Sequence, residues 1–432
     1  MSTGPRAVLI ALVVLAAVVV GLLVLQAGGA PIGLGPADVT PSPLGSPASA
    51  SPTPSAASVT SPSPDALTTS AQIEAAVVEI RGLPAAEIGP PDMITRADLQ
   101  KLVRANPDLI YPPAEREADN ITYHALGLLE PGEDVGELQL SLLEAALLGF
   151  YDDDPQGIVV VTDMGLDANA KYTYAHEYTH ALQDAALMID SLELDPEGVA
   201  DRSLAHAALL EGDAELTAGL WAVGGGLRPD EHDEVDELDD LLRATPGVPD
   251  WMISKVIFPY TTGLTWVQQI WSEGGFAAVD EAWASPPDST EQVIHFEKWA
   301  DREEPIAVSG PALAEALGPD WRQVESTPVG EATIGIVLEH FGVDPDAAAE
   351  AAAGWGGDRL TVAAAPDGAF ALAWIIAWDS PSDADEFSEA YQAALDALPF
   401  PADLVEMADG RTLVAHASHE ALLTTTIDAA GG

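Results

Sequence analysis

Two histidines, His176 and His180, lie four residues apart in a segment that has to be helical for them to act together. Residues four apart share one face of an α-helix, so both imidazole rings can reach a single metal ion. Glu177 is rotated from this face by just enough to touch a water molecule on that ion. Apolar residues continue at helical spacing after the second histidine, and we therefore predict a helix over residues 171–188.

The choice of metal ligands is limited because the chain contains no cysteine. Disulfides, thiolate catalysis, iron–sulfur clusters and thiolate zinc sites are thereby excluded. The His-Glu-x-x-His spacing is that of a zinc hydrolase, in which zinc takes three protein ligands and keeps one position open for water. The third ligand must therefore be another histidine or a carboxylate.

A second predicted helix, over residues 199–222, contains an acidic cluster inside an otherwise apolar run. Burial of an unpaired carboxylate is costly, so such a cluster needs a metal ion or a hydrogen-bond partner. Glu211 follows His180 after enough residues for a loop and a return helix, and we predict it as the third ligand. Gly212 lowers helix stability, but it removes a side chain where two helices approach closely.

Three further acidic residues lie near the predicted ligands. Glu215 is one turn beyond Glu211 on the same face, so we expect it to accept a hydrogen bond from a ligand imidazole, the alternative being an ordinary exposed charge. Asp213 points to another side of the helix. Asp184, one turn after His180, is expected either to orient a ligand or to be the third ligand itself, although aspartate ligands usually follow at a longer offset.

The chain is strongly acidic, with 70 Asp and Glu against 16 Lys and Arg and a net charge of −54. Such a charge repels phosphate, which argues against binding to nucleic acid or to an anionic membrane surface. Metal cations and cationic partners remain compatible with it. The composition also fits a protein that works in salt-rich water, although solubility alone explains it equally well.

The first 70 residues differ from the rest in composition. Residues 7–25 carry no charge and are long enough to cross a hydrocarbon core of about 30 Å. A cleaved signal peptide has a shorter apolar stretch, and here a proline follows the best cleavage position. We therefore predict a single-pass protein of the cell membrane, with a transmembrane anchor in residues 1–30 and its bulk outside the cytoplasm. Residues 31–70 are predicted to form a disordered Pro/Ser/Ala tether.

The rest of the chain is expected to form an α+β structure in two domains. Helical spacing and a buried strand over residues 157–162 place a mainly helical domain with a small sheet at residues 71–302. Its first helices are predicted over residues 95–105 and 135–149. Strand-like runs predict a small α+β domain at residues 303–432. These runs cover residues 360–365, 370–378, 404–408 and 412–417, with a helix over residues 382–397.

Several segments of the chain resemble bacterial membrane-anchored metallopeptidases of the glutamate-zincin kind. The matching segments are residues 149–152, 175–184, 210–214, 258–260, 289–299 and 354–359. The resemblance implies a zincin-like fold that binds Zn²⁺ through His176, His180 and Glu211, with Glu177 as the general base. Phe296 stands where we expect a proline, a departure that affects only a local turn.

These observations predict a zinc-dependent peptidase that hydrolyses peptide or protein substrates. His295 and Tyr260 are candidates to stabilise the oxyanion, since zinc peptidases commonly add a His or Tyr donor beside the metal; the alternative is that both are structural residues. The resemblance also implies that substrate lies along the edge of the strand at residues 157–162. The rival interpretation is a non-catalytic binding or structural module on the same scaffold, and the intact Glu177 argues against it.

Overall fold

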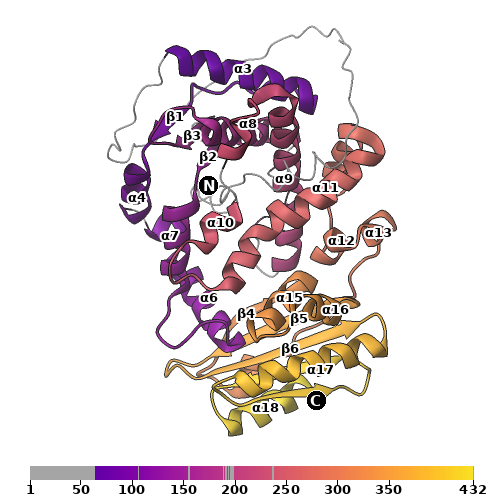
Figure 1. Ribbon diagram of the computed structural model, residues 1–432. Helices are drawn as coiled ribbons and strands as arrows, with labels where there is room; N and C mark the ends of the chain where they lie inside the picture. Colours follow the sequence, from indigo (N-terminus) through magenta and orange to yellow (C-terminus); the bar gives the residue numbers. More distant parts are fainter. Residues whose placement is uncertain are drawn as a thin grey trace.

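The computed structural model describes residues 64–431, apart from residues 106, 154, 155, 188, 190, 191, 193, 195–198, 236 and 237. It is an α+β structure with a helical N-terminal part that includes a three-stranded sheet, and a C-terminal part built on a five-stranded sheet. Figure 1 shows the helical part above and the orange-to-yellow sheet with its helices below. The predicted fold class is confirmed at this level.

The elements of the helical part are α3 (Pro64–Arg81), β1 (Asp92–Ile94), α4 (Arg96–Ala105), α5 (Pro107–Ile110), α6 (Pro113–Leu126), α7 (Val135–Ala146), β2 (Gly149–Asp153), β3 (Gln156–Val161), α8 (Ala168–Leu187), α9 (Ala200–Trp221), η2 (Ala222–Gly226), η3 (His232–Glu234), α10 (Leu238–Arg243), α11 (Asp250–Ala284), α12 (Thr290–Ile294) and α13 (Phe296–Ala300). The elements of the C-terminal part are α14 (Leu313–Leu317), β4 (Arg322–Thr327), α15 (Gly330–His340), α16 (Pro345–Ala352), β5 (Trp355–Ala364), β6 (Phe370–Trp378), α17 (Pro381–Ala397), β7 (Ala402–Glu406), β8 (Thr412–Ala417) and α18 (Glu420–Ala430). The predicted helices and strands are confirmed within a few residues, and the additional elements range from short helical turns to the 35-residue helix α11.

The small sheet has the strand order β1-β3-β2 and lies against α8. β3 pairs with β1 in parallel and with β2 in an antiparallel hairpin. α8 follows β3 after a short loop, so the sheet and the helix that carries His176 and His180 are fixed to each other. This sheet therefore forms one wall beside the two histidines.

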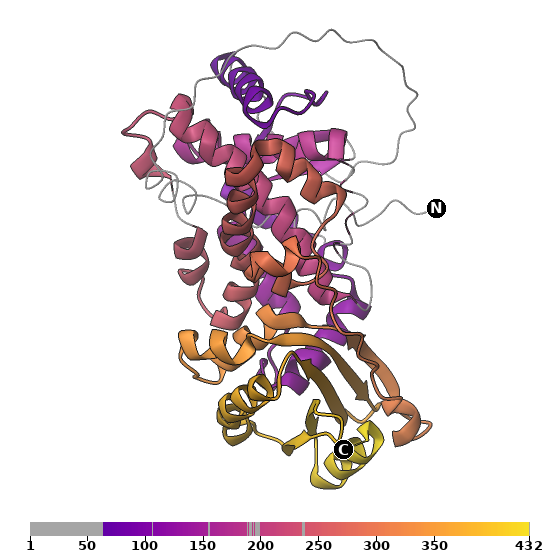
Figure 2. The ribbon, with the colours of Figure 1, turned by 90° about the vertical axis from the view of Figure 1, so that its right-hand side faces the viewer.

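The C-terminal sheet is antiparallel, with the order β4-β5-β6-β8-β7, and both of its faces are covered. One face packs with α6 and α15 to α17, and the other with α14 and α18. Figure 2 shows these helices around the sheet from the side. Every residue of β6 is buried, which explains why its sequence is apolar at every position rather than alternating.

The helical part and the C-terminal sheet share one hydrophobic core. α6 packs directly on β4, β5, β6 and β8. His416 in β8, which is fully buried, joins the two parts because its Nδ1 donates to the Ala125 carbonyl of α6 at 2.8 Å. The Tyr391 hydroxyl lies 3.1 Å from His416 Nε2. The domain predicted at residues 303–432 is therefore packed onto the first one.

We expect buried His416 to make stability depend on pH. Burial lowers the pKa of His416 from 6.5 to about 4. Its neutral form therefore stabilises the fold fully above pH 6.5, and this contribution is lost as the pH falls towards 4. Each pKa unit corresponds to about 1.4 kcal/mol, so His416 should lower the free energy of unfolding by about 2 kcal/mol between about pH 7 and about pH 5.

Urea unfolding midpoints of the wild type and His416→Gln at these two pH values measure the effect. The variant should show a smaller pH dependence than the wild type, whatever its stability at neutral pH. The exposed His419, two residues after β8, supplies a matched control as His419→Gln. Equal pH dependence in the wild type and His416→Gln would contradict the assignment.

Helices α9 and α11 cross at close range through two glycines. A Cβ on Gly212 would lie 2.4 Å from the carbonyl oxygen of Gly263, and one on Gly263 would lie 2.5 Å from that of Ala208. Neither position has room for a side chain. The close helix approach predicted at Gly212 is confirmed, although its partner is α11. This contact places α11 against the part of α9 that carries Glu211.

Two predictions about the N-terminal region need correction. Residues 64–70, assigned to the disordered tether, form the first turns of α3. Pro64 suits this position because a proline at the first helical residue loses no hydrogen bond, and Ser70 is already buried. The other tether residues, 31–63, and the apolar run at residues 7–25 lie outside the described residues.

The second correction concerns the prediction that the chain is a single-pass membrane protein. In the part of the chain that the structure describes, no helix combines the length and the apolar composition that a membrane crossing needs. A span takes about 20 mostly apolar residues, whereas α9 carries Asp201, Glu211, Asp213 and Glu215. The structure therefore does not support the predicted anchor, and the cell-membrane localisation that depended on it is withdrawn.

Candidate metal centre

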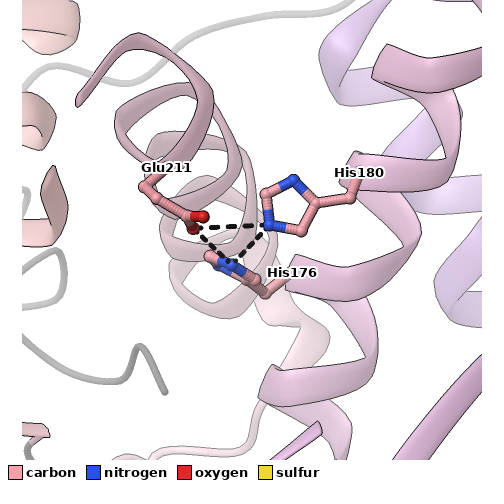
Figure 3. A group of neighbouring side chains, drawn as sticks. All are labelled: His176, His180 and Glu211. Carbon is pink, nitrogen blue, oxygen red and sulfur yellow. Dashed lines mark hydrogen bonds and ion pairs between the residues drawn. The ribbon is translucent and has the colours of Figure 1, made fainter. Parts of the chain in front are cut away.

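Two buried helices hold His176, His180 and Glu211 against one another. The histidines are in α8 and the glutamate is in α9. His176 Nε2 lies 3.0 Å from His180 Nε2 and 3.2 Å from Glu211 Oε2. His180 Nε2 lies 3.4 Å from the same oxygen. Figure 3 shows the three side chains pointing at one another, and we call these three atoms the ligand triangle.

The dimensions of the ligand triangle are close to those of a zinc site. Zinc bonds to imidazole nitrogen and carboxylate oxygen are about 2.0 to 2.2 Å long, so two ligand atoms of a tetrahedral site lie about 3.3 to 3.6 Å apart. The two facing Nε2 atoms repel each other unless one is protonated or both bind a cation. The three residues together therefore have the donor types and the spacing to hold zinc.

Two buried carboxylate oxygens beside the ligand triangle have neither a hydrogen bond nor an ion pair among the described residues. They are Oε1 of Glu211 and Oε2 of Glu177. A buried polar atom without a partner costs on the order of 1–3 kcal/mol, and more when it is charged. A cation with a bound water would supply the missing partners, so these oxygens also fit a metal site.

Buried glutamates make the centre electronegative. Glu177, Glu211 and Glu215 are each at most 3% exposed. Burial raises the pKa of Glu177 to about 7, although the neighbouring His176 opposes this shift. Burial alone would lower the pKa of His176, but Glu211 and Glu215 outweigh burial and raise that pKa well above its ordinary value. The centre therefore favours a positive charge between these side chains.

The second ring nitrogen of each histidine faces an oxygen atom. His176 Nδ1 lies 2.8 Å from Glu215 Oε1, and Glu215 also accepts a hydrogen bond from the Tyr172 hydroxyl. His180 Nδ1 lies 2.8 Å from Gln183 Oε1. An acceptor at Nδ1 keeps the ring proton there and leaves the lone pair of Nε2 free for a metal ion. Glu215 thus lies where the sequence placed it, whereas Gln183 was not singled out.

Strand β2 lies directly beside Glu177. The backbone N–H of Tyr151 donates to the Glu177 carboxylate. A Cβ on Gly149 would lie 3.4 Å from Glu177 Cγ and 2.5 Å from Thr173 Cγ2. Glycine at position 149 therefore lets β2 approach α8 closely enough to hold the carboxylate in place.

The strand expected to line a substrate is not at an edge of the sheet. β3, which corresponds to the strand predicted at residues 157–162, pairs with a neighbour on each side. Its backbone groups are therefore already used within the sheet. β2 ends the strand order on the side next to Glu177, so the available edge belongs to β2.

The structure separates the two predicted oxyanion donors. Tyr260 of α11 is buried, and its ring centroid lies 6.3 Å from that of His176. Burial, with a further contribution from Glu211, raises the pKa of Tyr260 well above its ordinary value, so the hydroxyl keeps its proton. His295, at the end of α12, instead has its Nε2 2.9 Å from Glu331 Oε1 in α15.

Asp184 has a different partner from the one expected. Its Oδ2 accepts a hydrogen bond from the Tyr151 hydroxyl at 2.8 Å, and the side chain is only partly buried. It is not part of the three-residue group that could hold a metal ion. This contact instead links α8 to β2, the strand whose Tyr151 backbone N–H also bonds the Glu177 carboxylate.

Part of the chain is similar to a known family. Residues 318–424 match a family described as a domain of unknown function, DUF8575. This segment covers most of the C-terminal part and includes none of the residues of the ligand triangle. No curated protein and no solved structure gave a match. The comparisons therefore give no information on the candidate metal centre.

Proposed function

We propose that the protein is a zinc-dependent peptidase whose helical part is a zincin-like domain. The observation that carries the proposal is the ligand triangle next to the buried Glu177, in the His-Glu-x-x-His spacing. His176, His180 and Glu211 would hold the zinc ion. Bound zinc supplies a water of lowered pKa and polarises the carbonyl under attack.

Glu177 is the general base in this proposal. Its Oε2 has no hydrogen-bond partner among the described residues, so it is free to accept the proton of the attacking water. The same carboxylate then passes the proton to the nitrogen of the leaving amine. A module that only binds a metal has no use for Glu177 Oε2, and a buried oxygen without a partner lowers the stability of the fold. The free oxygen therefore favours the peptidase over the non-catalytic module.

Two further elements fit the same reaction. The hydroxyl of Tyr260 keeps its proton and hydrogen-bonds the Glu211 carboxylate, and in the reaction it would turn to donate to the oxyanion that forms on the substrate carbonyl. An extended peptide that adds to the sheet beside Glu177 would pair with β2, since β3 has no free edge. The proposed substrate is therefore an extended peptide or an unfolded protein segment.

The direct test measures zinc and hydrolysis on one preparation of the full chain. We expect about one zinc per chain and cleavage of a mixed peptide library that stops when a chelator removes the metal. Stoichiometric zinc without any cleavage would favour the non-catalytic module. Absence of zinc binding would contradict the metal centre itself.

Glu211→Ala is expected to lose most of the bound zinc, because it removes one of three protein ligands and leaves two histidines. Zinc content after dialysis against a weak chelator measures the loss. Asp184→Asn serves as the matched control, since it changes an acidic residue near the histidines that lies outside the ligand triangle. Full zinc in Glu211→Ala together with loss in Asp184→Asn would instead make Asp184 the third ligand.

A further inference from the structure

Gln183 lies between His180 and a second buried acidic residue, Asp213. Its Oε1 is 2.8 Å from His180 Nδ1. Its Nε2 donates to Asp213 Oδ2 and to the backbone carbonyl of Leu210, both at 3.1 Å. The side chains of His180, Gln183 and Asp213 are fully buried, so water does not compete for these bonds.

The partners of Gln183 determine which way its amide group points. A carboxylate and a carbonyl oxygen can only accept hydrogen bonds, so the NH₂ group must face Asp213 and Leu210. The amide oxygen must then face His180, and an oxygen there requires the ring proton to be on Nδ1. The lone pair of His180 Nε2 is left pointing into the ligand triangle. The network, rather than the ring itself, therefore selects the tautomer.

Asp213 is held in turn by residues from two other helices. Arg81, the last residue of α3, has its Nε 2.8 Å from Asp213 Oδ1, and both side chains are completely buried. The indole N–H of Trp283 in α11 donates to Asp213 Oδ2 at 3.0 Å. A guanidinium and an indole N–H can only donate, so they keep Asp213 as an acceptor for Gln183. Four helices thus contribute to the orientation of one histidine.

We propose that Gln183 is a positioning residue for the metal centre, fixing His180 in the tautomer that turns Nε2 towards the ion. This inference rests on the proposed role of His180 as a zinc ligand. Gln183 acts on His180 through its amide oxygen. Its NH₂ group bonds Asp213 and Leu210, and these bonds hold the oxygen in place. Partners of this kind typically change metal affinity by about 10 to 100-fold.

Two substitutions separate this role from a merely structural one. Gln183→Leu and Gln183→Glu both lose the NH₂ group that bonds Asp213 and Leu210, but only Gln183→Glu keeps an acceptor for His180. Its second oxygen faces the buried Asp213 carboxylate, and two carboxyl groups this close keep one proton between them, which replaces the amide hydrogen bond. The apparent dissociation constant for zinc, measured on the full chain by competition with a fluorescent chelator, is the readout. We expect it to rise about 10 to 100-fold in Gln183→Leu and to stay within a few-fold of the wild type in Gln183→Glu.

Gln269→Leu is the matched control, since Gln269 is exposed on α11 and should bind zinc as the wild type does. Circular dichroism checks each fold, and Gln183→Ala replaces the leucine variant if that variant does not fold. Equal loss of affinity in the glutamate variant and in the variant without an acceptor would overturn the proposal, because only the glutamate variant keeps an oxygen that can face His180 Nδ1. Unchanged affinity in both would overturn it too. Failure of the wild type to bind zinc would instead contradict the proposed function.

Discussion

Glu177→Gln is expected to keep its zinc and lose peptidase activity by about 10² to 10⁴-fold. Glutamine has nearly the same size as glutamate, and its oxygen can still accept the backbone N–H of Tyr151. It cannot take up the proton of the attacking water or return one to the leaving amine. Because one carboxylate serves in both steps, we expect the loss to lie near the upper end of this range. Zinc content and peptide turnover on one preparation measure both effects.

Glu281→Gln is a suitable control for this variant, since Glu281 is exposed on α11 and has the same side chain. It should bind zinc and cleave peptide at the wild-type rate. If Glu177→Gln cleaves as fast as the control, the activity belongs to another site or to a contaminant. If it loses zinc together with activity, the substitution has disturbed the ligand triangle, and the test of the base must be repeated with Glu177→Asp.

The residues of the ligand triangle could be selected from sequence because their signals are local. His176 and His180 share a helix face at a spacing of four, which any straight helix brings together. Glu211 is conspicuous as a charge inside an apolar run, where burial requires a partner. The structure places all three atoms within hydrogen-bonding range of one another. Local spacing and charge were therefore sufficient at these positions.

Gln183 and Arg81 could not be selected in the same way, because their roles depend on contacts far along the chain. Gln183 carries no charge, and its significance lies in Asp213, which is 30 residues away. Arg81 ends α3, whose first turns were assigned to the tether because of their Pro, Ser and Ala composition. The buried face of α3 consists of Ser70, Ile73, Val77 and Arg81 at helical spacing, which a composition argument does not detect.

The segment around His295 shows the opposite error, in which a strong local signal has a different cause. The polar residues of α12 and α13 join the helical part to the C-terminal part. Lys298 lies 2.6 Å from both Glu291 of α12 and Asp379 at the end of β6, while His295 contacts Glu331 of α15. These charged side chains pair with one another where the two parts pack together, so their role is structural. A dense polar motif alone therefore does not distinguish a binding site from an internal junction.

Arg81→Met is expected to lower the free energy of unfolding by about 3–5 kcal/mol. The substitution keeps an unbranched side chain of similar length but removes the only positive charge known to contact Asp213 among the described residues. Asp213 is fully buried, so its carboxylate would lose its cation without gaining water. The contact of Arg81 with Asp280 at 2.7 Å and its packing on the ring of Phe276 are lost as well. The shift of the urea unfolding midpoint measures the effect, with a chelator present to exclude stabilisation by zinc.

Arg104→Met is the matched control, because Arg104 also lies in the last turn of a helix and also pairs with acidic side chains. Its bond to Glu137 spans 2.7 Å, but the two side chains are 44% and 60% exposed, so water screens the pair. Exposed pairs of this kind contribute about 0–1 kcal/mol. A midpoint shift for Arg81→Met as small as that for Arg104→Met would show that the buried pair is not needed for stability. A large shift for Arg81→Met alone would establish that α3 is an integral part of the helical domain and that Asp213 needs its cation.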